Sequence, residues 1–327
     1  MKKLKYISVQ PRNQYYAWQV EVMINNFIKN KIKPNDIHIL VSYSNLDESS
    51  APENIELWNK LVDNYKNVNF FFYEDKRKSR RYVSSIRPNI LKQHFNQFPK
   101  LVNNAIFYHD CDIAFTRIPD FKPFLNDDIW YLSDTNGYIN YDYVVSKGQD
   151  ILEKMCDIVD IDYDIPELHN NDSGGAQYLM KNVTPEFWEK VEDNSEKLFT
   201  EISDLSNHKV AINRHTVLPG EPTQEQYHPL QIWCADMWAV LWNIWYFGYE
   251  AKVNPYFNFC WPTQSIEEWD NNLIFHNAGV TEAGNLFYKA SYINDLPFSL
   301  ENTFDPKFCS YAYFSQIADL KNRTVLI

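Results

Sequence analysis

The chain has 327 residues, of which 45% are hydrophobic and 16% aromatic, and 31 basic side chains stand against 43 acidic ones. The net charge of −12 repels a phosphate backbone, which argues against general nucleic-acid binding. The five cysteines form no C-x-x-C pair, which gives no zinc-site spacing and favours free thiols in a reducing compartment. Because no apolar stretch is long enough for a signal peptide or a transmembrane segment, we expect a cytoplasmic protein.

The first third of the chain alternates between two kinds of apolar pattern. Apolar runs predict strands at residues 5–9, 37–43, 68–73 and 105–108, and apolar residues at helical spacing predict helices at 15–31, 52–65 and 87–98. This alternation predicts a mainly parallel sheet with right-handed crossovers. Ligands of such sheets bind at the carboxyl ends of the strands.

The rest of the chain is less regular. The patterns predict a strand at 129–132 and helices at 151–159 and 237–248. Residues 206–231 carry Pro, Gly, His and Asn with little periodicity, which predicts a long functional loop or lid. We find no internal repeat and no low-complexity linker, which favours a single α/β domain with a C-terminal extension.

Two aspartates spaced by one residue follow the apolar run at 105–108. Side chains alternate along a strand, so Asp110 and Asp112 would point to the same side and repel each other unless a cation lies between them. A hard divalent cation with oxygen ligands meets that need and is commonly shared with substrate phosphates. A strand that ends in a polar turn is the simpler alternative, since D-x-D occurs often by chance.

A glycine pair lies in the segment 170–178. Asp172 or Ser173 could cap a helix that follows, and Gly174 and Gly175 would let the backbone approach a ligand closely. The N-terminus of such a helix would favour an anionic or hydroxyl-rich ligand. A plain turn before a helix explains the same segment equally well.

Two further polar residues stand in apolar surroundings. Asp236 interrupts an aromatic stretch, where a buried acid has to be partnered or functional, and a raised pKa would suit a general base. A helix-capping role is the alternative. His276 ends an apolar run and could be a third metal ligand beside two carboxylates, although a lone histidine is usually structural.

One region of the chain is densely basic, and it contains Lys76, Arg77, Lys78, Arg80 and Arg81. In an acidic protein this cluster is either a solvated face or a patch that recognises phosphate. Arginine suits bidentate contact with phosphate. Arg87, ahead of Pro88 and a predicted helix, is the better candidate for a phosphate ligand.

Taken in order, these segments resemble the common core of the GT-A fold glycosyltransferases, over residues 4–290. That core carries a D-x-D metal motif, a glycine loop, an acidic x-E-D motif and a C-terminal histidine. The corresponding positions here are Asp110 and Asp112, then Gly174 and Gly175, then Asp236, then His276. The sequence departs from the family at Ala235, where glutamate is usual.

The resemblance implies a GT-A type, Rossmann-like, mainly parallel sheet with flanking helices and an irregular C-terminal extension. It implies one catalytic domain over 1–295, with a nucleotide-binding part at about 1–115 and an acceptor part at about 116–295, and an extension at 296–327. The implied cofactor is Mn²⁺ or Mg²⁺, held by Asp110, Asp112 and His276 against the donor diphosphate.

The implied activity is transfer of a sugar from a nucleoside-diphosphate donor, with UDP-sugars favoured, to a hydroxyl of a glycan, a protein or a small molecule. Asp236 would be the general base of an inverting reaction, although retaining members also carry a D-x-D and a C-terminal histidine. The implied donor-binding residues are Gln10, Arg12, Arg87, Asp110, Cys111, Asp172, Gly174, Gly175 and Lys289.

Two other functions stay open at this point. A nucleotidyltransferase acting on a sugar phosphate shares the α/β pattern and the paired acids. It usually carries a glycine-rich basic signature near the first strand, which residues 9–13 lack. A non-catalytic carbohydrate-binding protein would use the abundant aromatic side chains as a stacking surface.

Overall fold

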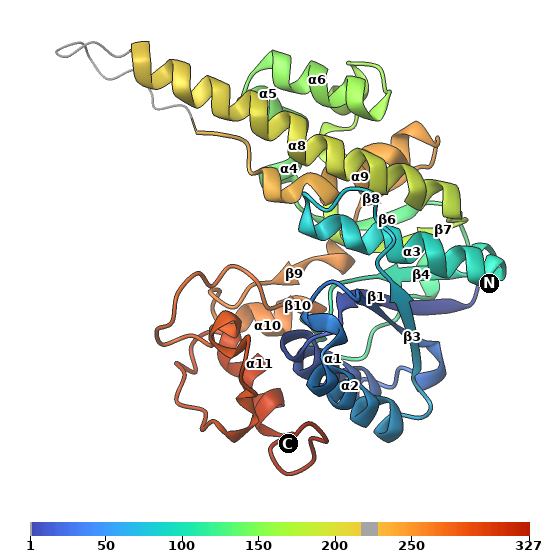
Figure 1. Ribbon diagram of the computed structural model, residues 1–327, viewed down its shortest axis with the longest axis vertical. Coiled ribbons are helices and arrows are strands. Elements are labelled where there is room, and N and C mark those ends of the chain that lie inside the picture. The colour runs from blue at the N-terminus through green and yellow to red at the C-terminus, as the bar shows by residue number, and fades with distance from the viewer. Residues whose placement is uncertain (1, 217–227) are drawn as a thin grey trace.

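A computed structural model describes the backbone of residues 2–216 and 228–327, and the side chains of 2–211 and 228–327. Its centre is a seven-stranded sheet in the order β3-β2-β1-β4-β7-β6-β8 (Figure 1). The strands are β1 (Leu4–Pro11), β2 (Ile37–Tyr43), β3 (Asn69–Glu74), β4 (Ala105–Tyr108), β6 (Trp130–Asp134), β7 (Gly174–Lys181) and β8 (Ala251–Val253). Only β7 among them runs antiparallel to its neighbours, so the predicted mainly parallel α/β sheet is confirmed.

Helices cover the sheet and join its strands. The longer ones are α1 (Gln14–Lys29), α2 (Pro52–Asn64), α3 (Ile86–Gln97), α6 (Gln149–Val159), α8 (Pro185–Thr216), α9 (Ala235–Tyr246) and α11 (Cys309–Ala318). The short ones are α4 (Asn136–Ile139), α5 (Tyr141–Val145), α7 (Ile165–Leu168) and α10 (Glu267–Asn271). Within the described ranges, no helix combines the length and the apolar character that crossing a membrane requires.

The two faces of the sheet pack against different sets of helices. In β1, Tyr6 belongs to a buried cluster formed with α1, α2 and α11, whereas Ile7 belongs to a cluster formed with α3, α8 and α9. In β4, Phe107 belongs to the first of these clusters and Tyr108 belongs to the second. Because neighbouring strand residues point to opposite faces, strands covered on both faces read as continuous apolar runs.

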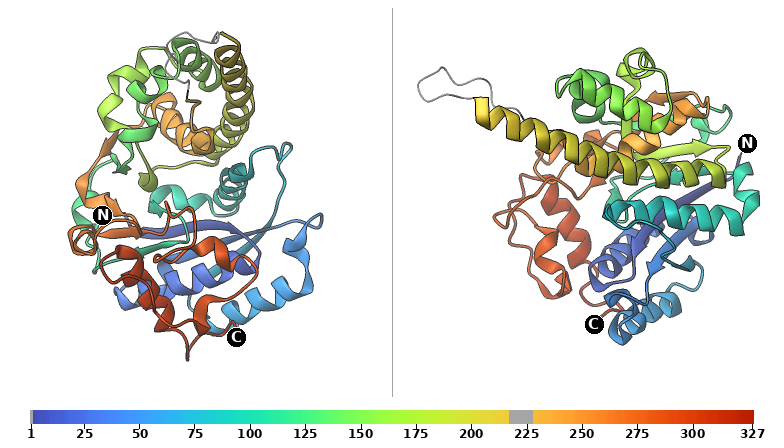
Figure 2. Two further views of the ribbon diagram at one scale, coloured as in Figure 1. Left: turned by 90° about the vertical axis from the view of Figure 1, so that its left-hand side faces the viewer. Right: turned by 45° about the horizontal axis from the view of Figure 1, so that its top comes forward.

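The C-terminal helix packs against the first half of the chain. Tyr313 and Phe314 of α11 are buried in the cluster that α1 forms. Glu21 of α1 accepts hydrogen bonds from the Thr324 hydroxyl at 2.5 Å and from the Val325 backbone N–H at 3.1 Å. Both views in Figure 2 show this end of the chain beside α1 and α2, and α8 on the other side of the molecule.

A small second sheet lies beside the large one, in the order β5-β10-β9. It contains β5 (Ile113–Phe115), β9 (Phe259–Cys260) and β10 (Ile274–His276). β10 is antiparallel to β5, and His276 lies opposite Ile113. This pairing joins a late segment of the chain to the residues that directly follow β4.

Two expectations about local structure are wrong. The segment after Asp172 and Ser173 is the strand β7, not a helix, because it fills the place between β4 and β6. Residues 206–216 belong to α8 and not to a loop; they continue a helix whose earlier turns bury an apolar stripe that includes Val191, Leu198 and Ile202. Residues 217–227 of the expected lid lie outside the described part of the chain.

Candidate functional site

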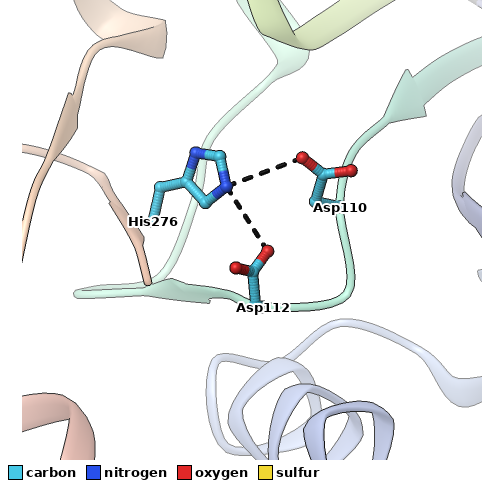
Figure 3. A group of neighbouring side chains, drawn as sticks. All are labelled: Asp110, Asp112 and His276. Carbon is cyan, nitrogen blue, oxygen red and sulfur yellow. Dashed lines mark ion pairs between the residues drawn. The ribbon is translucent and has the colours of Figure 1, made fainter. Parts of the chain in front are cut away.

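Three side chains converge just beyond the carboxyl end of β4 (Figure 3). Nε2 of His276 lies 3.5 Å from Oδ2 of Asp110 and 3.4 Å from Oδ1 of Asp112. Both aspartates lie in the turn between β4 and β5, so the expectation that strand alternation aligns them is wrong. The pairing of β5 with β10 brings them to His276, and the Asn277 N–H donates to the Asp112 carbonyl at 3.0 Å.

The donor atoms of this cluster fit a divalent cation. One ligand atom from each of the three residues lies within 4.8 Å of the others. Burial alone would raise the pKa of Asp112, but the charges of Lys289 and His276 hold it well below its usual range, so the carboxylate is ionised. Two carboxylates and one imidazole match the ligand preferences of Mn²⁺, and Mg²⁺ accepts the oxygen ligands.

A second acid is joined to the cluster through an arginine. Nη1 of Arg87 lies 3.0 Å from Oδ1 of Asp110 and 3.3 Å from Oδ2 of Asp236. Burial alone would lower the pKa of Arg87, but Asp110 and Asp236 raise it well above its ordinary value. Arg87 is therefore a permanent cation that fixes the spacing between the two acids.

Asp236 lies in the first turn of α9 and is nearly buried, and each of its oxygens has a partner. The Tyr82 hydroxyl donates to Oδ1 at 2.6 Å, and Arg87 pairs with Oδ2. The expectation that this buried acid has to be partnered is confirmed.

The loop that carries Tyr82 is held by a glutamate of α8. Glu196 accepts hydrogen bonds from the hydroxyls of Ser79 and Ser85 at 2.7 and 2.6 Å, and from the Tyr82 N–H at 3.3 Å. Neither Tyr82 nor Glu196 could be found from the sequence, because each meets its partner only through contacts between distant segments.

His276 is held from behind by a polar side chain of β7. Nε2 of Gln177 lies 3.3 Å from Nδ1 of His276, and Oε1 of Gln177 accepts the Ser133 hydroxyl at 3.0 Å. All three residues are buried. The sequence signal for Gln177 is a single amide in the otherwise apolar run of residues 174–180, and sequence reasoning missed it.

Two cavities meet at the charged residues. The smaller one has a volume of about 260 Å³ and is lined by Asp112, Cys111 and Lys289. The larger one has a volume of about 690 Å³ and is lined by Asp236 and by many aromatic side chains. Arg87, Asp110 and His276 line both cavities and form the boundary between them.

The structure therefore brings together seven of the predicted site residues, namely Arg87, Asp110, Cys111, Asp112, Asp236, His276 and Lys289. Lys289 forms an ion pair with Oδ2 of Asp112 inside the smaller cavity. Burial raises the pKa of Cys111 well above its ordinary value, so Cys111 is a neutral thiol there.

Five other predicted site residues, all within the described ranges, line neither cavity. Gln10 is buried and donates to the Leu40 carbonyl at 3.0 Å. Arg12 donates to the Ser50 hydroxyl at 3.2 Å. Asp172 accepts the Val253 N–H at 3.2 Å.

The remaining two are the glycines, and the chain packs tightly around both. A Cβ atom on Gly174 would come within 2.5 Å of Cβ of Leu132 and 2.6 Å of the Ser133 carbonyl oxygen, so Gly174 allows β7 to lie close against β6. A Cβ atom on Gly175 would come within 2.7 Å of Cε of Met237. The next residue, Ala176, lines the larger cavity.

Neither a protein-family model nor a curated protein matches the chain. The chain is similar to the structure of the bifunctional glycosyltransferase WbbM in its apo form, with 10% identity and a TM-score of 0.45, over 98% of this chain and 50% of that one. It therefore spans half the length of WbbM.

Two further solved structures are similar to the chain. One is a glycosyltransferase involved in the glycosylation of the major capsid of PBCV-1, with 12% identity and a TM-score of 0.38, over 85% of this chain and 94% of that one. The other is the mannosyltransferase PcManGT from Pyrobaculum calidifontis in complex with GDP-Man and Mn²⁺. Its identity with this chain is 11% and the TM-score is 0.29, over 75% of this chain and 71% of that one.

Proposed function

We propose that this protein is a metal-dependent glycosyltransferase that moves a sugar from a nucleoside-diphosphate donor, with UDP-sugars favoured, to a hydroxyl acceptor. The observation that carries the proposal is the cluster of Asp110, Asp112 and His276, of which Asp110 and His276 line both cavities, with Asp236 on the side of the larger cavity only. Transfer needs a place for a leaving diphosphate and a place for an acceptor, and such a boundary separates them.

The donor side is the smaller cavity in this proposal. Asp110, Asp112 and His276 would hold the cation, which neutralises charge on the leaving diphosphate when it is bound. Lys289 lines the same cavity and brings a second positive charge close to the phosphates. Cys111 and Arg87 complete the donor contacts, while Gln10, Arg12, Asp172, Gly174 and Gly175 support the surrounding backbone.

The acceptor side is the larger cavity. The acceptor oxygen forms a bond to the anomeric carbon of the donor sugar as the bond from that carbon to the diphosphate oxygen breaks. Asp236 takes the proton that the acceptor hydroxyl loses. A base on the side opposite to the leaving group suits a single displacement, and therefore inversion. Tyr82 and Arg87 hold the Asp236 carboxylate in position for that step.

A panel of UDP-, GDP- and other nucleotide sugars tests the proposal. We expect one donor to raise the unfolding temperature and to be slowly hydrolysed with Mn²⁺, and both effects to disappear with EDTA. Pyrophosphate release from a nucleoside triphosphate and a sugar phosphate would instead identify a nucleotidyltransferase. Glycan binding that needs neither nucleotide nor metal, and that Asp236→Asn leaves unchanged, would identify a carbohydrate-binding protein.

A further inference from the structure

The larger cavity has two regions of different chemistry. Arg87, Asp110, Asp236 and His276 stand together on one side of it. The rest of the wall comes from α3, α8, α9 and the adjoining strands, and its buried part is lined by Tyr108, Tyr178, Trp188, Val191 and Val240. The buried wall beyond the charged groups is therefore aromatic and aliphatic, and the other polar side chains of the lining, Arg81, Ser84 and Gln231, are exposed or half-buried.

The buried part of the chamber offers few hydrogen-bond partners. Its described lining contains phenol hydroxyls and one indole N–H, but no carboxylate, amide or amine. The charged groups at the other end already pair with one another. The indole N–H of Trp188 finds no hydrogen-bond partner among the described residues. A sugar ring buried there would leave several hydroxyls unpaired, which is costly, whereas an apolar group would leave none.

The position of Asp236 shows which substrate would reach this chamber. Asp236 lines the larger cavity and not the smaller one, whereas Asp112 and Lys289 line the smaller cavity and not the larger one. A hydroxyl that gives its proton to Asp236 has to approach through the larger cavity. The group attached to that hydroxyl then lies among the aromatic and aliphatic side chains.

We infer, on the basis of the proposed function, that the acceptor carries an aryl or hydrocarbon group next to its reacting hydroxyl, and that this group fills the apolar chamber between α3, α8 and α9. The volume of about 690 Å³ lies within the range of roughly 300–1,000 Å³ that is usual for small-molecule sites. At the exposed edge, Trp233 stacks on Tyr138 with ring centroids 6.2 Å apart, and both rings line the cavity. These two rings extend the apolar wall toward solvent.

Matched pairs of glycosides test the inference without any need for turnover. Each sugar of a hexose panel is presented as its 4-nitrophenyl and its methyl glycoside, and binding to the whole protein is measured by calorimetry with UDP and Mn²⁺ present. We expect the 4-nitrophenyl member of at least one pair to bind about tenfold more tightly, as burial of an aromatic ring requires. Equal affinity within every pair, or no binding by any pair, would overturn the inference.

Variants that fill the chamber show whether the 4-nitrophenyl group binds inside it. Val191→Phe adds bulk from α8 and Val240→Phe adds it from α9, so one variant remains informative if the other fails to fold. We expect the preference for the 4-nitrophenyl member to disappear in each folded variant. Val62→Phe, the same change on α2 outside the cavity, should retain it. A preference that survives both chamber variants would contradict the inference.

The result also separates this inference from the proposed function. A preference for 4-nitrophenyl glycosides that Val191→Phe removes, in a protein that consumes no nucleotide sugar, would support the chamber and contradict the glycosyltransferase. Transfer to methyl glycosides as efficient as transfer to 4-nitrophenyl glycosides would support the glycosyltransferase and contradict the chamber as the acceptor site.

Discussion

Gln177 and His276 meet through their side chains, with Nε2 of Gln177 3.3 Å from Nδ1 of His276. Ser133 continues the contact, because its hydroxyl lies 3.0 Å from Oε1 of Gln177 and 2.7 Å from the Phe257 carbonyl. With the amide N–H toward Nδ1, Nε2 of His276 carries the proton and donates to Asp110 and Asp112. With the amide oxygen toward Nδ1, that nitrogen carries the proton and Nε2 offers its lone pair to a cation.

Gln177 is therefore expected to set the metal affinity of the site. Gln177→Leu removes the partner of Nδ1, and we expect Mn²⁺ to bind about 10- to 100-fold more weakly. The electron paramagnetic resonance signal of free Mn²⁺ measures this during a titration. Gln177→Glu keeps an acceptor for the Nδ1 proton and should bind Mn²⁺ at least as tightly as the wild type. Wild-type affinity in Gln177→Leu would show that His276 needs no such support.

Asp236 is expected to act on the acceptor and not on the metal. Asp236→Asn should lower the rate of sugar transfer by about 10²- to 10⁴-fold, the usual contribution of a general base, with Mn²⁺ affinity near that of the wild type. Steady-state kinetics and a Mn²⁺ titration measure the two effects. Asp204→Asn changes an exposed aspartate of α8 and should leave both unchanged. Parallel losses of metal affinity and rate in Asp236→Asn would place Asp236 in the metal site.

Two buried histidines are expected to make stability depend on pH. Nδ1 of His38 lies 3.1 Å from Nε2 of His94, whose Nδ1 lies 2.7 Å from the Tyr73 hydroxyl. Burial, with the charge of Lys5, lowers the pKa of His38 to about 4, and burial beside His38 lowers the pKa of His94 to about 3. Below pH about 6.5 the unfolded chain binds protons that the folded chain does not, so the free energy of unfolding decreases as the pH falls from about 6.5 toward 4.

The contribution of one histidine to this dependence is about 1.4 kcal/mol per pH unit. His94→Gln should therefore reduce the slope of the unfolding free energy against pH by about that amount over this range. Urea denaturation at a series of pH values measures the slope. His208→Gln changes an exposed histidine of α8 and should keep the full slope. An unchanged slope in His94→Gln would mean that these rings accept protons in the folded protein.

The strands and helices of residues 5–108 could be predicted because their patterns are local. Strands such as β2 are covered on both faces and read as short apolar runs, and α2 begins with Pro52 at its first position. The sequence predicts a helix where β7 begins, because Asp172 and Ser173 are residue types that cap helices as well as form turns before strands. The close contacts of Gly174 with β6 make this segment a strand, and those contacts join residues that are far apart in the sequence.

The members of the candidate site could be predicted in part because their residue types are unusual where they stand. Asp236 interrupts an apolar run, His276 ends one, and the D-x-D follows one. Their partners Tyr82, Gln177 and Glu196 are common residue types in ordinary positions. Only the packing of α8, β7 and the loop before α3 makes those residues part of the site.

We propose that a cation held by Asp110, Asp112 and His276 drives release of a nucleoside diphosphate from a nucleotide sugar. The most direct test measures that release for the wild type and for Asp112→Asn across a Mn²⁺ titration, with Asp204→Asn as the control. We predict saturable Mn²⁺-dependent release by the wild type and the control, and a loss of both rate and saturation in Asp112→Asn. Release that needs no metal, or that Asp112→Asn leaves unchanged, would show that these residues hold no cation for the reaction.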